Sequence, residues 1–384
     1  MDEPGFIVIG SGPGGVSAAD AFRHHNRELP VRILTADPEP PYARPPLSKD
    51  YLRGDTDDVW LHPAHWYAER SIDLRLAAEV VAIDPGAHTV TADGDTYPYT
   101  ALVLACGAAP TPLPVPGGHH ALQLRSLADA ARLRKAAADA ASAVVVGAGF
   151  IGCEVAASLA LNGLAVTLVA PERVPQEKRL GSAAGRRLQA LVELTGARYV
   201  GGVSVRELTE GVVRLDNGVS IDCDLIVAAT GVTPRSALAE HAGLNIRDSR
   251  VVVGADMRSS APDVYAVGDL ALAFNPRIGR HIVVEHWQDA DDQGAIAGSD
   301  AAGQPSTWQN VPGFWSTIGD ATLKYHAWGD GYDHDRLLER ADGFTVWYES
   351  DGSAVGVLTH AADDDYDTGE TLIAEARPTP VLMN

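Results

Sequence analysis

The chain has little cysteine: Cys106, Cys153 and Cys223 are the only three in 384 residues. They lie far apart in the sequence, and no Cys-x-x-Cys pair occurs. This spacing argues against a dithiol redox mechanism. Their neighbours are small or apolar residues, which favours inert buried thiols over reactive ones.

Long apolar runs and an excess of positive charge are also lacking. No run approaches the ~20 apolar residues of a membrane-spanning helix, and no signal peptide is recognisable, because an apolar strand begins at Phe6. The formal net charge of −21 argues against nucleic acid or an anionic membrane as a partner. We therefore expect a cytoplasmic protein whose acidic runs, such as residues 363–365, serve solubility.

Patterns for metal binding and hydrolysis are absent as well. The pairs His24-His25 and His119-His120 have no cysteine or carboxylate at ligand spacing, so we expect no metal site. No Gly-x-Ser-x-Gly segment occurs, and nothing in the sequence indicates hydrolytic chemistry.

The sequence does contain two glycine-rich dinucleotide fingerprints, each directly after an apolar run. The first comprises Gly10, Gly12, Gly14 and Gly15, and the second comprises Gly147, Gly149 and Gly152. Glycine permits the tight turn, lets the backbone approach a pyrophosphate and lets the next helix pack closely on the strand. That helix points its N-terminal N–H groups at the phosphates. Two such units predict two bound nucleotides, most simply a flavin and a nicotinamide, and hence an oxidoreductase.

An acidic residue follows the first unit. Residues 33–37 are predicted as its second strand, which ends in Asp37. An acid at that point typically binds a ribose hydroxyl, so Asp37 is the first candidate and Glu39 the second.

A proline-rich segment, 38–46, leads into Leu47-Ser48-Lys49 and predicts a rigid loop. Residues 41–49 resemble the signature of the ferredoxin-reductase family of flavoproteins, which supply oxygenases and cytochromes P450 through small iron–sulfur proteins. Rubredoxin reductases and apoptosis-inducing factor are similar in architecture. Further motifs that resemble the family follow in the same order, at residues 104–107, 229–234, 264–269, 285–294 and 314–316.

The resemblance implies three catalytic residues. Lys49 is expected near flavin N5, paired with Glu154, and Trp315 is expected beside the flavin and the nicotinamide. An ammonium at that place would stabilise the negative charge that develops as the flavin is reduced, and the carboxylate would hold the lysine in its charged form. The alternative is a purely structural ion pair between domains.

It also implies a set of cofactor-binding residues. Arg44 is expected at the flavin or its phosphates, Asp269 at the ribityl hydroxyls and Glu285 at the nicotinamide carboxamide. Trp287 either stacks at the cofactor or packs in the core. The motifs add Cys106, Gly107, Gly231, Gly268 and His286 to this set.

The chain also departs from the family pattern. The second strand of the second unit ends in Ala170, where NADH-using members usually have a glutamate. Glu172 could substitute for this glutamate, whereas Arg173 would instead accommodate a 2′-phosphate. The preference for NADH or NADPH therefore stays open. After Ser316 the usual Asp-Gln pair is replaced by residues 317–320, which lie near the expected acceptor face.

The fold class that follows is α/β. We expect two Rossmann-like dinucleotide-binding domains, as in glutathione reductase, and a small α+β C-terminal domain. The FAD domain should comprise residues 1–112 and 241–310, the NAD(P) domain 113–240 and the C-terminal domain 311–384. We expect a hairpin of an antiparallel sheet in the C-terminal domain. It is predicted by alternating apolar and polar residues at 344–349, the Asp351-Gly352 turn and the apolar residues 354–358.

These expectations combine into one functional hypothesis. The chain takes electrons from NADH or NADPH through FAD to a small carrier protein, a [2Fe–2S] ferredoxin, and acts as a monomer or homodimer. A reductase of rubredoxin or of another small acceptor is the alternative within the same chemistry. The alternative from a different functional class is a redox-sensing flavoprotein with slow catalytic turnover, like apoptosis-inducing factor.

Overall fold

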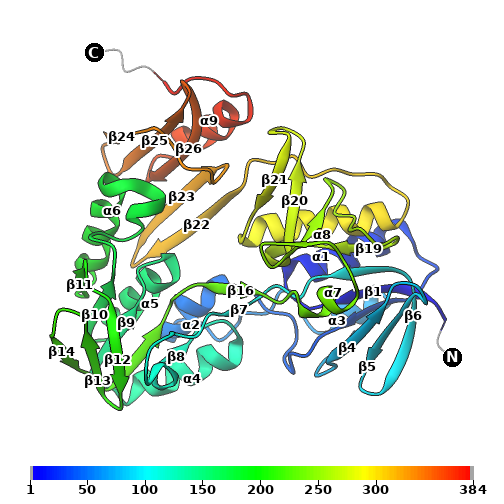
Figure 1. Cartoon of the computed structure of the whole chain (residues 1–384), viewed down its shortest axis with the longest axis horizontal. Coiled ribbons are helices and arrows are strands. Elements are labelled where there is room, and N and C mark those ends of the chain that lie inside the picture. Colours follow the sequence, from blue (N-terminus) through cyan, green and yellow to red (C-terminus); the bar gives the residue numbers. More distant parts are fainter. Residues whose placement is uncertain (1–2, 381–384) are drawn as a thin grey trace. The chain divides into compact units, whose positions relative to one another are not determined.

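A computed structural model describes residues 3–380. The chain divides into two compact units (Figure 1). Unit 1 consists of residues 3–43, 60–109 and 233–312, and unit 2 of residues 44–59, 110–232 and 313–380. After residue 60 the chain passes from one unit to the other within strand β7 (Ala108–Pro110), within strand β16 (Val232–Pro234) and just before strand β22 (Gly313–Ile318).

Unit 1 is built on a parallel sheet in the order β3-β2-β1-β6, with β19 on the other side of β6. The strands are β1 (Gly5–Ile9), β2 (Val31–Leu34), β3 (Ile72–Arg75), β6 (Asp95–Leu104) and β19 (Val264–Ala266). β1 is apolar along its whole length and buried throughout, as expected for a strand covered on both faces. Strands β4 (Val80–Asp84) and β5 (Thr89–Ala92) extend β6 as an antiparallel ribbon.

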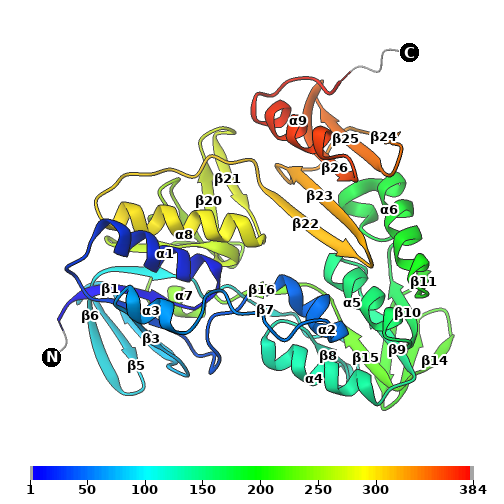
Figure 2. The ribbon, with the colours of Figure 1, turned by 180° about the vertical axis from the view of Figure 1, so that it is seen from behind.

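Two helices of unit 1, α1 (Pro13–His25) and α8 (Trp287–Ala301), lie side by side (Figures 1 and 2). Their backbones approach closely, since a Cβ on Gly294 would collide with the carbonyl oxygen of Gly14, and one on Gly298 with that of Ala18. Phe22 of α1 stacks on Phe6 of β1 with the ring centres 4.2 Å apart. Small residues on α8 thus allow it to pack directly on the fingerprint helix.

Unit 1 also contains a second sheet in the order β17-β18-β20-β21 and three short helices. Its strands are β17 (Ile246–Arg247), β18 (Arg250–Val253), β20 (Ala271–Asn275) and β21 (Arg280–Val283). The helices are α3 (His65–Glu69), α7 (Ala237–His241) and the 3₁₀ helix η3 (Gly268–Leu270).

Unit 2 contains the second parallel sheet, in the order β11-β10-β9-β15-β8. Its strands are β8 (Leu122–Gln123), β9 (Ser142–Val146), β10 (Ala165–Ala170), β11 (Arg198–Gly201) and β15 (Leu225–Ala228). The helices are α4 (Leu127–Ala138), α5 (Phe150–Leu161), α6 (Glu177–Leu194) and the 3₁₀ helix η2 (Gly118–His120). An antiparallel sheet of β12 (Val205–Thr209), β13 (Val212–Leu215) and β14 (Ser220–Asp222) completes this part.

The C-terminal part of unit 2 is an antiparallel sheet in the order β22-β23-β26-β25-β24, with helix α9 (Asp363–Ala374) against it (Figure 1). The strands are β22 (Gly313–Ile318), β23 (Ala321–Ala327), β24 (His334–Glu339), β25 (Phe344–Ser350) and β26 (Ser353–His360). β25 and β26 pair antiparallel, which confirms the predicted hairpin. The predicted α/β fold class, with two dinucleotide-binding sheets and a small α+β part, is likewise confirmed.

One hydrophobic core runs through unit 2. It joins residues of the parallel sheet, such as Val145, to Leu358 of the C-terminal sheet. It also includes Leu52 from the segment 44–59. Residues 38–49 were predicted as a rigid loop, but Pro45–Ser48 fold into the 3₁₀ helix η1, because proline is well tolerated in the first turn of a helix. The short helix α2 (Asp50–Arg53) follows Lys49.

Candidate functional site

The two fingerprints fold in the same way, one in each unit. Gly10 has φ +107° and Gly147 has φ +105°, in the left-handed region that favours glycine. A Cβ on Gly10 would collide with the carbonyl oxygen of Ala105, and one on Gly147 with that of Ala229. Ala105 follows β6 and Ala229 follows β15, and each of these strands is the parallel neighbour of its fingerprint strand. Glycine is therefore required at equivalent places in both sheets.

The last glycine closes each turn against the first. A Cβ on Gly15 would collide with the carbonyl oxygen of Gly10, and one on Gly152 with that of Gly147. Helices α1 and α5 begin directly after Gly12 and Gly149, and neither helix start is capped by a side chain. The first N–H groups and the positive end of each helix dipole therefore suit a phosphate. The residues present thus fit a dinucleotide pyrophosphate in each unit.

Asp37 lies three residues beyond β2 and not at the end of the strand, where the sequence analysis placed it. The strand ends at Leu34, and the chain then turns as the Thr35 hydroxyl accepts a hydrogen bond from Asp37 N (3.3 Å). The Asp37 carboxylate accepts hydrogen bonds from the Tyr42 hydroxyl (2.8 Å) and from Glu39 N (3.1 Å). These contacts orient the side chain, and each carboxylate oxygen keeps a further acceptor site.

Gly268 and Asp269 begin η3 directly after β19 and Val267. The N–H of Gly268 donates a hydrogen bond to Gln293 Oε1 of α8 over 2.9 Å. This contact joins two of the motifs on which the family resemblance was based. Because β19, β6 and β1 are parallel, Asp269 lies at the same edge of the sheet as the first fingerprint.

Glu285 precedes helix α8 and forms an ion pair with the guanidinium of Arg250. His286 is the N-cap residue of α8, and its Nδ1 lies 3.3 Å from Asp289 Oδ2. Trp287 is the first residue of the helix. Arg250 has no signal in the sequence, because it belongs to no motif and is 35 positions from Glu285.

All three cysteines are free. Burial raises the pKa of the Cys106 thiol to about 11, and burial also raises the pKa values of Cys153 and Cys223. Because the thiolate is the reactive form, these thiols are poor nucleophiles at neutral pH. Burial of Cys153 and Cys223 agrees with the expected buried thiols, and the inertness of all three stays a prediction.

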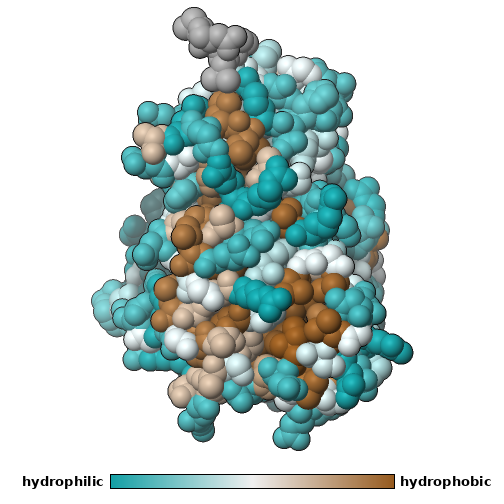
Figure 3. All heavy atoms as spheres, turned by 90° about the vertical axis from the view of Figure 1, so that its left-hand side faces the viewer, coloured by the Kyte–Doolittle hydropathy of each residue, from teal (hydrophilic) through white to brown (hydrophobic). Residues whose placement is uncertain are grey.

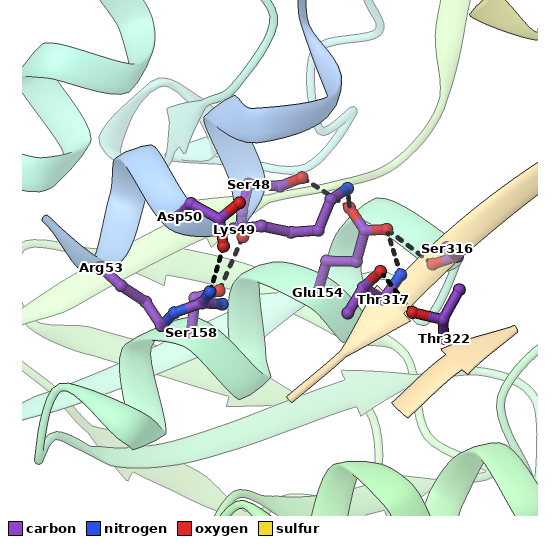
Figure 4. A network of polar contacts seen from close by, with 9 residues as sticks. All are labelled: Ser48, Lys49, Asp50, Arg53, Glu154, Ser158, Ser316, Thr317 and Thr322. Atoms are coloured by element: carbon purple, nitrogen blue, oxygen red, sulfur yellow. Dashed lines mark hydrogen bonds and ion pairs between the residues drawn. The ribbon is translucent and has the colours of Figure 1, made fainter. Parts of the chain in front are cut away.

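Lys49 and Glu154 form a buried ion pair within unit 2 (Figure 4). Lys49 Nζ lies 2.9 Å from Glu154 Oε2, and the two residues are 9% and 2% exposed. Lys49 follows η1 and donates its N–H to Pro46 O over 3.0 Å, while Glu154 lies in the first turns of α5. The structure therefore brings together the two residues whose pairing the resemblance implied.

The Glu154 carboxylate is surrounded by donors (Figure 4). Its Oε2 accepts hydrogen bonds from Ser48 Oγ (2.5 Å) and Lys49 Nζ, and its Oε1 accepts them from Ser316 Oγ (2.6 Å) and Thr317 N (3.2 Å). A buried charge is costly unless such partners compensate for the lost water. These contacts fix the carboxylate and, through it, the lysine. No role was expected for Ser48 or Ser316 from the sequence.

Trp315 is the neighbour of Ser316 on β22, where successive side chains point to opposite faces. Ser316 is buried at the ion pair, whereas Trp315 is 44% exposed. Arg44 lies just before η1, and its carbonyl oxygen accepts a hydrogen bond from Leu47 N over 3.0 Å. Two further residues expected at a cofactor thus lie in the same unit as the ion pair.

The remaining predicted residues lie near the ends of strands in the two parallel sheets. Ala170 is the last residue of β10, and Glu172 follows two positions later. Gly231 has φ +98° and lies in the turn between β15 and β16. Gly107 has φ +62° and lies in the corresponding turn after β6 of unit 1.

Residues 3–380 contain no cluster of three or more histidine, cysteine, aspartate or glutamate side chains arranged to hold a metal ion. Within the same range, no helix is both long enough and apolar enough to cross a membrane. Hydrophilic residues cover much of the face shown in Figure 3, between separate apolar patches.

Comparison with known proteins agrees with this geometry. The family model described as pyridine nucleotide-disulphide oxidoreductase matches residues 5–294. The chain belongs to this family. Its members are oxidoreductases, so the chain is an NAD(P)H-dependent oxidoreductase whose cofactors are FAD and NAD(P)H.

Two curated relatives and one solved structure are similar over most of the chain. A ferredoxin–NAD(+) reductase component of an anthranilate 1,2-dioxygenase system from Burkholderia cepacia is 33% identical, over 84% of this chain and 82% of its own. A rubredoxin–NAD(+) reductase from Pseudomonas putida is 33% identical, over 89% and 91%. The covalent putidaredoxin reductase–putidaredoxin complex superposes with a TM-score of 0.92 at 27% identity, over 98% and 94%.

Proposed function

We propose that this chain is the flavoprotein reductase of an electron-transfer chain. It takes electrons from NAD(P)H and delivers them to a small iron–sulfur carrier protein, a [2Fe–2S] ferredoxin. The observation that carries the proposal is the buried Lys49–Glu154 pair in a chain with two dinucleotide turns and no thiol pair. Relatives named as ferredoxin and rubredoxin reductases support the same reaction class.

We assign one nucleotide to each fingerprint. The glycine turn of unit 1 would hold FAD, together with Asp37 at a ribose and Asp269 at the ribityl chain. The glycine turn of unit 2 would hold the nicotinamide nucleotide. Bound FAD supplies the chemistry of accepting a hydride and releasing electrons singly.

Lys49 has the charge and the rigidity that a reductase site needs. Lys49 is 9% exposed, so the field of its ammonium is screened less than that of a surface lysine. A fixed positive charge in such a place stabilises negative charge that develops during the reaction, without reorganising water. Glu154 keeps this ammonium in one position through the contact with Nζ. We therefore propose Lys49 as a catalytic residue and Glu154 as the residue that positions it.

Trp315 is the third residue that we assign to the reaction. Its indole is large and 44% exposed, and it lies on the strand that also bears Ser316. An exposed aromatic ring can stack on a planar ligand or contact a protein partner. We propose that it lies by the flavin and the nicotinamide. We further propose that the enzyme is cytoplasmic, where three free cysteines stay reduced, and acts as a monomer or homodimer.

An anaerobic titration followed by an acceptor assay tests the proposal. The purified protein is titrated with NADH and, in parallel, with NADPH while flavin absorbance is recorded. Bleaching at near-stoichiometric nucleotide supports the first half-reaction, and a flavin that neither nucleotide bleaches contradicts it. Reduction of a purified [2Fe–2S] ferredoxin is then compared with that of a rubredoxin. Faster reduction of rubredoxin would replace the proposed acceptor by the alternative one.

A further inference from the structure

The end of strand β10 in unit 2 decides which nicotinamide nucleotide this site accepts. In dinucleotide-binding folds an acidic residue near this point binds the ribose diol of NADH, and an arginine accommodates the 2′-phosphate of NADPH. Here the last strand residue is Ala170, which is 2% exposed and offers no polar atom on its side chain. Selection must therefore depend on the residues that follow.

Glu172 is held in a fixed position just after the strand. Its carbonyl oxygen accepts hydrogen bonds from Tyr199 Oη (2.8 Å) and from Gly202 N (3.0 Å). Its side-chain Oε1 accepts a hydrogen bond from Lys178 N (3.0 Å), in the first turn of α6. Among the described residues, Oε2 makes no hydrogen bond. A preoriented, half-buried carboxylate thus keeps one oxygen for a ligand.

The segment that bears Glu172 turns back toward the glycine fingerprint. Gln176, four residues later, has φ +58°, and its Nε2 lies 3.8 Å from the place where Gly149 would carry a Cβ. Gly149 is the glycine at which the backbone approaches a pyrophosphate. Residues 171–176 therefore lead back to the turn that would hold the pyrophosphate of a dinucleotide.

Arg173 is poorly suited to receive a phosphate. Its side chain is 82% exposed, and its guanidinium lies 2.7 Å from Glu177 Oε1. A 2′-phosphate at this place would compete with Glu177 for the guanidinium and would approach the Glu172 carboxylate. Like charges at such short range are unfavourable.

We infer that Glu172 selects NADH over NADPH. It would take the place of the acidic residue that NADH-binding folds usually have at the strand end, two positions earlier. The inference rests on the proposed function in one respect only, that the second fingerprint holds the nicotinamide nucleotide. It assigns the ribose diol to Glu172 Oε2 and assigns no ligand contact to Arg173.

A binding measurement without turnover tests this inference. Isothermal titration calorimetry compares ADP-ribose with 2′-phospho-ADP-ribose, on the wild-type holoprotein and on Glu172→Gln. The wild type should bind ADP-ribose at least about tenfold more tightly, and Glu172→Gln should lose most of that preference, since one hydrogen bond to a charged group corresponds to about tenfold or more. Glu193→Gln, the same change at the other end of α6, should leave the preference intact.

Two results would overturn the inference. One is tighter binding of the 2′-phosphorylated ligand by the wild type together with its loss in Arg173→Ala, which would assign selection to the arginine. The other is an unchanged preference in Glu172→Gln. Tight ADP-ribose binding in a protein whose flavin NADH does not reduce would instead contradict the proposed function and leave the assignment of Glu172 in place.

Discussion

Ser316 and Glu154 are 162 positions apart in the sequence, yet Ser316 Oγ donates a hydrogen bond to Glu154 Oε1 over 2.6 Å. Through this contact the first strand of the C-terminal sheet holds the carboxylate that in turn holds Lys49. A serine that is distant in sequence from both fingerprints thus helps to position the ammonium.

Replacing Ser316 by alanine should therefore affect both stability and flavin reduction. Glu154 would lose one donor while it remains buried, so the free energy of unfolding should fall by about 1–3 kcal/mol. Reduction of bound flavin by NADH should also slow, by about tenfold, since small misplacements of reacting groups are costly. Urea unfolding and anaerobic stopped-flow absorbance measure the two effects.

Two further variants separate positioning from general destabilisation. Ser316→Thr keeps the hydroxyl and should restore most of the reduction rate. Ser353→Ala removes an exposed hydroxyl that donates to Ala376 O, and it should leave the rate unchanged. Equal slowing in Ser316→Ala and Ser353→Ala would show that the contact with Glu154 has no specific role.

Replacing Lys49 by methionine should slow flavin reduction by about 100-fold, the scale on which losing one preorganised electrostatic group slows other enzymes. Methionine keeps an unbranched, flexible side chain that is one atom shorter, and it removes the charge. Lys135→Met removes an exposed lysine from α4 and serves as the matched control. Stopped-flow traces with NADH give the rate, and an unchanged rate in Lys49→Met would exclude this residue from the reaction.

A substitution in one glycine turn should impair binding of one ligand and leave binding of the other unchanged. Gly147→Ala should abolish measurable ADP-ribose binding and leave bound flavin in place, because a Cβ there would collide with Ala229 O. Gly10→Ala should instead lower the flavin content, through the equivalent collision with Ala105 O. Calorimetry and the flavin-to-protein absorbance ratio measure the two losses.

Gly163→Ala is the control for these variants. Gly163 also has a positive φ, of +92°, but a Cβ there meets no atom within 4 Å. It therefore introduces comparable backbone strain without a collision, and both ligands should still bind. If Gly163→Ala lost either ligand, strain alone would explain the other two variants.

The pH dependence of Cys106 should reflect its burial. Because burial raises its pKa to about 11, alkylation by iodoacetamide in the folded protein should be slow near neutral pH and accelerate only toward pH 11. A pKa raised by folding also means that this thiol stabilises the fold below its unfolded pKa of about 8.5. This stabilisation is then lost as the pH rises to about 11.

Mass spectrometry of the peptide that contains Cys106, after timed labelling at several pH values, measures this dependence. Denatured protein provides the reference for an accessible thiol. Rapid labelling of the folded protein at neutral pH would contradict the assigned burial. Cys106→Ser should retain flavin reduction, since no step that we propose uses a thiol.

Local patterns in the sequence predicted the glycine turns, but they did not predict the contacts between distant segments. Gly10 and Gly147 were recognised because a strand, a glycine string and a helix follow one another within a few residues. Asp37 was predicted as the end of a strand, but the strand ends three residues earlier. The chain turns there, and Asp37 N donates a hydrogen bond to the Thr35 hydroxyl. Threonine fits a strand equally well, so the sequence does not reveal this turn.

Contacts between distant segments followed from resemblance or were missed. The pairing of Lys49 with Glu154 came from a family motif, not from any spacing in the chain. Arg250, which pairs with Glu285, and Ser48, which donates to Glu154, have no local signal, because only the folded chain brings these residues together. Burial and hydrogen bonding identify them once the structure is known.

The segment 44–59 has a consequence for dissecting the protein into parts. It bears Lys49 and Leu52, and it packs into unit 2 although the chain on both sides of it belongs to unit 1. A recombinant fragment of residues 110–232 would contain the second glycine turn but neither the lysine nor the leucine that fills its core. Chimeras between related reductases should therefore exchange residues 44–59, residues 110–232 and the C-terminal sheet together, as one structural unit.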